Sequence, residues 1–284
     1  MNRFPTRLIL LLFFVASCSS AKRASAPAPN VITITATDYA FGAPDTIPAG
    51  LTTFRMINQG REPHQAVIMG APGKTLAELE AAAVPKGPIP EWWTAVLRLQ
   101  PTFPGGPGVV MGADSSIVTF DIPPGRYVIV CFMPSPDGTL HAQKGMVRHL
   151  VVTPAPQGAT AAAEPSAGVT VTLSDYAFAT SRPLTAGTHT IRVENRGPQG
   201  HELTVERLAP GKTFADWQRW LASGMRGPPV SAPVGGFVGP DKGNVGWVTL
   251  TFTRGTYLFT CYVPDDKDGA PHLMHGMVQQ ITIS

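Results

Sequence analysis

Charged residues and cysteines are scarce in this chain of 284 residues. Asp, Glu, Lys and Arg make up only 14% of the sequence, the formal net charge is +3, and there are three cysteines. The basic residues are scattered, without the Lys/Arg cluster that marks a nucleic-acid surface, so we expect no nucleic-acid partner. Hydrophobic residues make up 43%, which is enough for a folded core and argues against general disorder.

A long apolar run is also missing. The N-terminal run Leu8–Val15 is far shorter than the ~20 apolar residues that a membrane-spanning helix needs. It follows the positively charged Arg3 and Arg7 and precedes small residues, which is the layout of an export signal. The sequence Val15-Ala16-Ser17-Cys18 resembles the bacterial lipobox, in which the cysteine is lipidated and becomes the mature N-terminus.

That resemblance implies a lipoprotein signal peptide over residues 1–18, followed by a linker of small residues over 19–29. It also implies an exported protein, periplasmic or on the cell surface, that a lipid on Cys18 holds at the membrane. Ser19 in place of an aspartate favours the outer membrane if the cell is Gram-negative. The alternative is an ordinary signal peptide with an incidental cysteine.

The rest of the chain is an internal repeat. Val31–Phe41 recurs as Val169–Phe178, one residue shorter, and Phe54–Gly60 recurs as Ile191–Gly197. An Ala/Pro-rich stretch without periodicity separates the two copies. We therefore expect a first domain, a linker and a second domain, over residues 30–153, 154–167 and 168–284.

Each copy has the composition and periodicity of strands. Apolar and polar residues alternate with period two, Thr, Val, Ile and Tyr are abundant, and Pro-Gly and Asp-Gly pairs mark turns. One helical segment interrupts each copy, at Thr75–Ala83 and at Thr213–Ala222. In the second segment Trp217 and Trp220 lie one helical turn apart, and we expect them to pack onto the strands. The sequence thus predicts an all-β chain of two tandem β-sandwiches, each with a short helical insertion.

Cys131 and Cys261 occupy equivalent places in the two copies, each at the end of an apolar strand. In an exported protein a disulfide has to be considered first. A bridge between equivalent positions of separate domains would need a symmetric contact between those domains, however, and the surrounding residues favour a metal.

Each copy contains, in order, a histidine after an Asn-x-Gly sequence, a cysteine, a second histidine and a methionine. These residues are His64, Cys131, His141 and Met146 in the first copy and His201, Cys261, His272 and Met277 in the second. A thiolate, two imidazoles and a weak axial thioether form the blue-copper ligand set. The sequence therefore predicts two copper ions, one in each domain.

The motif resembles that of the cupredoxin family, which includes plastocyanin and azurin. The resemblance covers both copies and implies a Greek-key β-sandwich and electron transfer by copper. Nine residues separate Cys131 from His141, and ten separate Cys261 from His272. Small cupredoxins have much shorter loops here, and the longer loop is closer to the type 1 site of copper nitrite reductases. The resemblance therefore does not extend to the docking surface.

Four ligands fill the coordination sphere and leave no position for a substrate, so the sequence favours a non-enzymatic electron carrier that serves redox proteins at the membrane. Multicopper oxidases and nitrite reductases add further copper through His-x-His pairs and a histidine beside the blue-copper cysteine. Neither feature occurs in this chain. Copper delivery, storage or sensing would use the same ligands and is the alternative.

Another histidine of the second copy, His275, also precedes Met277. His272 aligns with His141 of the first copy, and both stand five positions before a methionine, whereas His275 aligns with Lys144. We therefore expect His272 to be the ligand and His275 to lie at the rim of the site.

Overall fold

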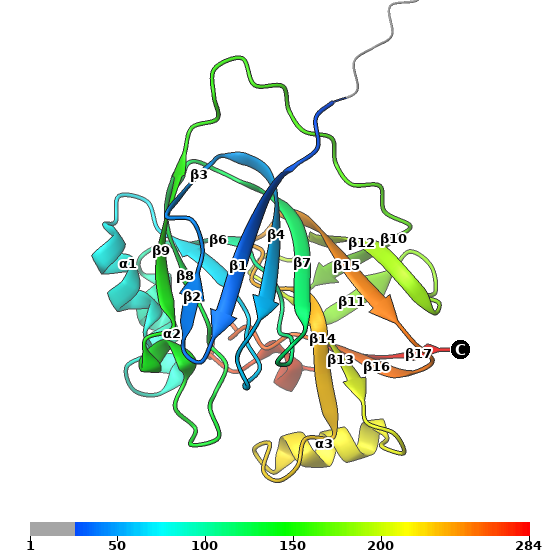
Figure 1. The fold of residues 1–284 in the computed structure, drawn as a ribbon. Coiled ribbons are helices and arrows are strands. Elements are labelled where there is room, and N and C mark those ends of the chain that lie inside the picture. Colours follow the sequence, from blue (N-terminus) through cyan, green and yellow to red (C-terminus); the bar gives the residue numbers. More distant parts are fainter. Residues whose placement is uncertain (1–25) are drawn as a thin grey trace, which may run out of the picture.

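The computed structural model describes residues 26–284, so the predicted signal peptide and Cys18 lie outside the described residues (Figure 1). Within this range the chain forms three β-sheets and three α-helices. None of the described helices is both long and apolar enough to span a membrane.

The first half of the described chain holds nine strands, two α-helices and one 3-10 turn. In chain order they are β1 (Asn30–Thr37), β2 (Ala40–Gly42), β3 (Thr46–Pro48), β4 (Gly50–Asn58), β5 (Val67–Gly70), α1 (Leu76–Ala83), α2 (Ile89–Leu97), β6 (Thr102–Gly105), β7 (Ser115–Ile122), β8 (Gly125–Val130), η1 (His141–Lys144) and β9 (Val147–Thr153). The second half repeats this order with one helix and one strand fewer, since β3 has no counterpart. Its elements are β10 (Val169–Ser174), β11 (Ala177–Thr180), β12 (Gly187–Asn195), β13 (Leu203–Leu208), α3 (Phe214–Ala222), β14 (Ser231–Phe237), β15 (Val245–Phe252), β16 (Gly255–Thr260), η2 (His272–His275) and β17 (Val278–Ile283).

Each half packs two sheets together, and one of these sheets is shared. The shared sheet has the strand order β11-β10-β12-β15-β7-β4-β1-β2, the first half adds the sheet β3-β9-β8-β5-β6, and the second half adds β14-β13-β16-β17. The chain leaves the shared sheet after β4 and returns in β7, and it does the same between β12 and β15, as in a Greek key. The predicted all-β, cupredoxin-like sandwich is confirmed. The division into domains at residues 154–167 stays a prediction.

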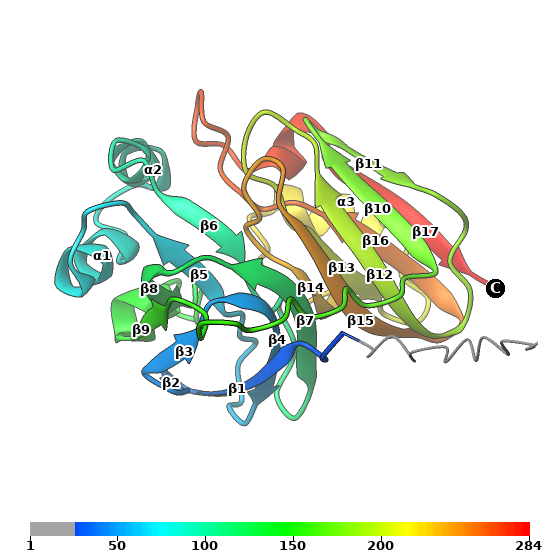
Figure 2. The same cartoon turned by 90° about the horizontal axis from the view of Figure 1, so that it is seen from above.

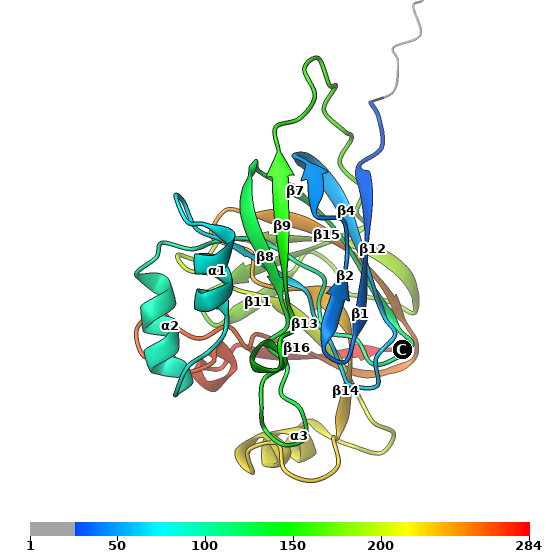
Figure 3. The same ribbon diagram turned by 60° about the vertical axis from the view of Figure 1, so that its left-hand side comes forward.

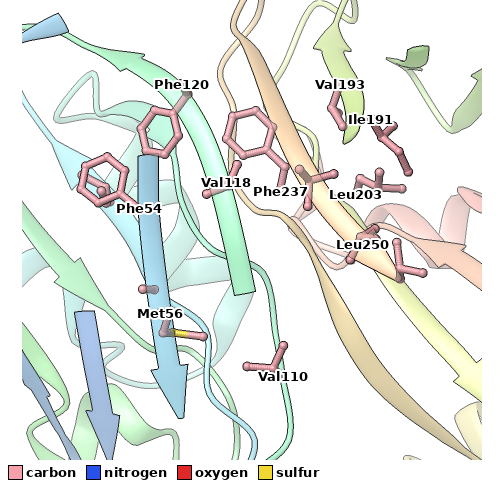
Figure 4. Packing of buried hydrophobic residues seen from close by; sticks show 14 of the residues in the cluster. Phe54, Met56, Val110, Val118, Phe120, Ile191, Val193, Leu203, Phe237 and Leu250 are labelled. Atoms are coloured by element: carbon pink, nitrogen blue, oxygen red, sulfur yellow. The ribbon is translucent and has the colours of Figure 1, made fainter. Parts of the chain in front are cut away.

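The halves meet along β7 and β15, as the view from above shows (Figure 2). Residues 117–120 of β7 pair antiparallel with residues 246–249 of β15, which makes the shared sheet continuous. Phe237 of β14 packs against Phe120 of β7, with 5.5 Å between the ring centroids (Figure 4). One hydrophobic cluster therefore contains core residues of both halves.

Glycines make this close contact possible. A Cβ atom on Gly105 would lie 2.1 Å from the Phe237 ring, and one on Gly108 would lie 2.5 Å from the backbone nitrogen of Gly236. Gly236 also has a φ of +151°, which side chains rarely adopt. Its carbonyl accepts a hydrogen bond of 3.1 Å from the amide of Gly108 in the first half. The junction of the halves consequently depends on residues without side chains.

The two predicted helical segments are confirmed as α1 and α3. Each begins at a capping box, in which Thr75 or Thr213 exchanges hydrogen bonds with the acidic residue three positions later. Trp217 is buried and Trp220 is partly buried in one cluster with Leu258 of β16, so both tryptophans pack onto the sheet as expected.

Helix α2 is absent from the sequence-based predictions. Pro88 and Pro90 stand at its start, where proline is tolerated because the first amides of a helix have no intrahelical partner. The side chains of Trp92 and Trp93 in this helix are buried. The indole nitrogen of Trp93 donates to a carboxylate oxygen of Asp266 at 3.3 Å, so α2 lies against the loop that precedes η2 in the second half (Figure 3).

Substituting Gly108→Ala tests the packing at the junction of the halves, because its Cβ would lie 2.5 Å from the backbone nitrogen of Gly236 in the other half. Its Cβ would meet backbone rather than a movable side chain, so we expect the free energy of unfolding to fall by more than ~2 kcal/mol. Gly168→Ala is the control, because nothing lies within 4 Å of that Cβ and the backbone conformation is ordinary. Denaturant titration of both variants checks this, and equal midpoints would contradict it.

Candidate metal centres

His64, Cys131 and His141 form a buried group in the first half, and none of them has exposed surface. The Nδ1 atoms of the two histidines are 3.0 Å apart, and Sγ of Cys131 lies 3.8 Å from Nδ1 of His64 and 3.4 Å from Nδ1 of His141. Bonds of about 2.0–2.3 Å, as zinc makes to nitrogen and sulfur, place two donors of one ion roughly 3–4 Å apart. The three donor atoms therefore fit a single metal ion.

His201, Cys261 and His272 form the same group in the second half, also without exposed surface. The two Nδ1 atoms are again 3.0 Å apart, and Sγ of Cys261 lies 3.3 Å from Nδ1 of His272. All donor atoms of this group lie within 4.8 Å of one another. The repeat in the sequence is thus a repeat of the same geometry.

Both predicted methionines lie beside these groups and are completely buried. The backbone amide of Met146 donates to the carbonyl of His141 at 2.9 Å, and its carbonyl accepts from the amide of Cys131 at 3.2 Å. The amide of Met277 donates to the carbonyl of His272 at 3.0 Å. The fold brings all eight residues predicted from the sequence to two places.

The Asn-x-Gly sequence before the first histidine has a structural explanation. The side chain of Asn58 accepts from the amide of Gly60 at 2.9 Å and donates to the carbonyl of Glu62 at 2.8 Å, which fixes the loop that leads to His64. A Cβ on Gly60 would lie 2.7 Å from Nε2 of His64. Glycine therefore leaves room for the imidazole, and Gly197 does the same in the second half.

The second histidine of each half starts a 3-10 turn. The amide of His141 donates to the carbonyl of Met133 at 2.8 Å, and the turn ends at Gly145, which has a φ of +98°. In the second half Gly276 ends the equivalent turn with a φ of +96°. The glycine directly before each methionine is the residue that most easily adopts this left-handed conformation.

Carboxylates behind the imidazoles are part of the site and escaped the sequence-based prediction. Nε2 of His64 lies 2.7 Å from Oδ1 of Asp38, and Nε2 of His201 lies 2.9 Å from Oδ1 of Asp175. In the first half Nε2 of His141 also lies 2.8 Å from Oε2 of Glu62. The Asp-Tyr pair that recurs in the two copies was the available signal, but nothing in the sequence connected it with the histidines.

These carboxylates determine which imidazole nitrogens can bind a metal. In His64 and His141 the Nε2 proton is donated to a carboxylate, so Nδ1 presents its lone pair. Burial lowers the pKa of His141, and in the second half burial together with His201 lowers that of His272 to about 4, which keeps these rings neutral. Two lone pairs and one thiol thus converge, and a cation can replace the thiol proton.

His275 lies outside the group formed by His201, Cys261 and His272. It is exposed, its Nε2 is 3.2 Å from a carboxylate oxygen of Asp268, and its ring packs against Tyr176. The structure therefore places it next to the second group without directing it at Cys261.

Cys131 and Cys261 are both free thiols, so the disulfide considered from the sequence does not form. Each half is a two-sheet sandwich that holds one buried group of two histidines and a cysteine. These features agree with the resemblance of the sequence to cupredoxins.

No protein family and no curated protein matches the sequence. Among solved structures, reduced auracyanin from Roseiflexus castenholzii is 21% identical over 45% of this chain and 99% of its own, with a TM-score of 0.31. Auracyanin A from Chloroflexus aurantiacus, described as a "blue" copper protein, is 22% identical over 44% of this chain and 100% of its own, with a TM-score of 0.30. A copper-containing nitrite reductase from Thermus scotoductus is 13% identical over 90% of this chain and 62% of its own, with a TM-score of 0.27. Values this low carry no functional information.

The buried thiols make a testable prediction for the metal-free protein. Burial raises the pKa of Cys131 to about 12 and raises that of Cys261 well above its usual range, so the reactive thiolate is rare at pH 8. We expect neither cysteine to be alkylated by iodoacetamide in the native protein and both to react in guanidinium chloride. Peptide mass spectrometry identifies the labelled residue, and rapid native labelling of either cysteine would contradict the burial.

Proposed function

We propose that the chain binds two copper ions, one at each group, and that it transfers electrons. The observation that carries the proposal is the convergence of two imidazole Nδ1 atoms and one thiol in each half, with a methionine beside them. Two nitrogen donors, a thiolate and a weak thioether are the donor set of blue-copper electron-transfer sites. Bound copper would supply one-electron redox chemistry there.

The protein residues have distinct parts in this proposal. Cys131 and Cys261 lose their protons and act as thiolate ligands, and the amide of Glu202 donates to Sγ of Cys261 at 3.3 Å. The buried Met146 and Met277 would supply the weak thioether donors. Because every donor is buried, these residues would keep water from a bound ion.

Burial of the donors also favours electron transfer over catalysis and over copper delivery. An enzyme would need an open coordination position, and a protein for copper delivery would need a donor that an acceptor protein can reach. All six nitrogen and sulfur residues of the two groups lack exposed surface. Retained copper that exchanges electrons agrees best with this arrangement, so we propose a carrier without catalytic turnover.

The place of this carrier follows from the N-terminal sequence. We propose that lipid on Cys18 anchors an exported protein to a membrane and that its partners are redox proteins at that membrane. Stable anchoring takes more than one acyl chain, since a single chain binds with only about 10⁴ M⁻¹.

The copper proposal is tested by metal analysis and visible spectroscopy. We expect two coppers per chain and an intense colour in the oxidised protein, because the thiolate-to-copper transition absorbs strongly. Cys131→Ser and Cys261→Ser should each remove one copper and about half of the absorbance. A colourless protein with both sites filled would contradict the assignment of the thiolates as ligands.

The choice between His272 and His275 is tested in the same way. Nδ1 of His272 is directed at Cys261, whereas His275 faces Asp268, so His272→Ala should bleach the second site and leave the first unchanged. His275→Ala should retain the absorbance of both sites. The reverse pattern would show that the longer loop presents the other histidine.

A further inference from the structure

The two centres differ in where each places a carboxylate near its second histidine. Glu62 stands two positions before His64, and the equivalent residue before His201 is the neutral Gln199. Four positions after the cysteine the difference is reversed, since Ser135 in the first half corresponds to Asp265 in the second. Each half thus has one carboxylate at this pair of positions, but on opposite loops.

The exchange changes which group contacts the imidazole. In the first half Oε2 of Glu62 lies 2.8 Å from Nε2 of His141, at hydrogen-bond distance. In the second half the nearest oxygen of Asp265 lies 3.7 Å from Nε2 of His272, which has no hydrogen-bond partner among the described residues. The second carboxylate is therefore close to the ring but does not accept its proton.

Asp265 is held away from His272 by three other donors. Its carboxylate accepts from the hydroxyl of Tyr176 at 2.6 Å, from the side-chain amide of Gln199 at 3.0 Å and from the amide of Lys267 at 2.8 Å. Gln199 is thus both the neutral substitute for the glutamate and the residue that ties up the aspartate. In the first half the hydroxyl of Tyr39 donates to Glu62 at 2.7 Å, and Glu62 still reaches its histidine.

The remaining hydrogen bonds at the imidazoles match in the two halves. His64 and His201 each have their Nε2 atom on an aspartate, Asp38 or Asp175, at nearly equal distances. The contact of the second histidine is consequently the main difference among the imidazole partners. A carboxylate that accepts the N–H of a metal-bound imidazole increases the basicity of that ligand.

We propose that the position of this carboxylate sets the reduction potentials of the two centres separately. Glu62 strengthens His141 as a donor and favours the oxidised form of the first centre, whereas Asp265 does this more weakly for His272. The residues at positions 62, 135, 199 and 265 therefore tune potential without being ligands. This inference rests on the proposed copper function and adds that the two sites are not equivalent.

The test measures the potential of one centre at a time, in the full chain with the other cysteine changed to serine. With Cys261→Ser, adding Glu62→Gln should raise the potential of the first centre by about 59 mV, which is a tenfold change in the ratio of reduced to oxidised protein. The double exchange Glu62→Gln with Ser135→Asp retains the charge and moves it to the position it has in the second half. It should also raise the potential.

The reciprocal exchange and a control complete the design. With Cys131→Ser, changing Gln199→Glu and Asp265→Ser should lower the potential of the second centre. Each variant is compared with its own parent, because Glu202 beside Cys261 corresponds to Gln65 in the first half. Glu80→Gln removes an exposed carboxylate that pairs with His149, away from both centres, and should change neither potential.

The hydrogen bond between His141 and Glu62 can also be tested in the metal-free protein. In the metal-free protein the Nε2 proton of His141 should exchange with solvent more slowly than that of His272, and the difference should shrink in Glu62→Ala, which removes the acceptor. Suppose the variants keep their colour and the ratio of reduced to oxidised protein changes by less than a factor of about two. This inference would then be wrong, and the copper function would stand. A chain that takes up no copper would overturn both.

Discussion

The pairing of each first histidine with an aspartate is the interaction on which the rest of each site depends. With Nε2 of His64 bound to Asp38, the ring can present only Nδ1 to the interior, where it meets the second imidazole and the thiol. Gly60 must lack a side chain because the same imidazole occupies that space. The Asn-x-Gly sequence, the glycine and the aspartate thus serve a single purpose, which is to fix one nitrogen lone pair in a buried position.

Burial gives these groups their chemical character. A thiol with no exposed surface holds its proton more tightly, and burial lowers the pKa of His141 and His272, which favours their neutral form. A metal ion reverses this preference by replacing the thiol proton. Rigid surroundings of this kind suit a centre that changes oxidation state without rearrangement. The same burial makes small differences in nearby charge effective, as in the exchange of Glu62 for Gln199.

The junction of the halves gives the two centres a fixed relation. The shared sheet, the ring of Phe237 and the glycines around it form one continuous core. Helix α2 adds a second connection, because Trp92 packs on Phe132, the neighbour of Cys131, while Trp93 binds Asp266 in the loop before His272. The surroundings of one centre therefore touch those of the other through two consecutive tryptophans.

The sequence by itself determined the strands, the helical segments that begin at Thr75 and Thr213, and the residues of both His-Cys-His groups. Alternation, capping and motif spacing are patterns in the sequence, and the repeat displays them twice. Tertiary structure alone decided the rest. Helix α2 follows a proline-rich start that reads as a loop, and its tryptophans are explained only by the surfaces they cover. The join between β7 and β15 and the contacts of Asp38, Glu62 and Asp265 link residues far apart in the chain. Hydrogen bonds of this kind depend on distances of a few tenths of an ångström between side chains, and only the packed sheets fix those distances.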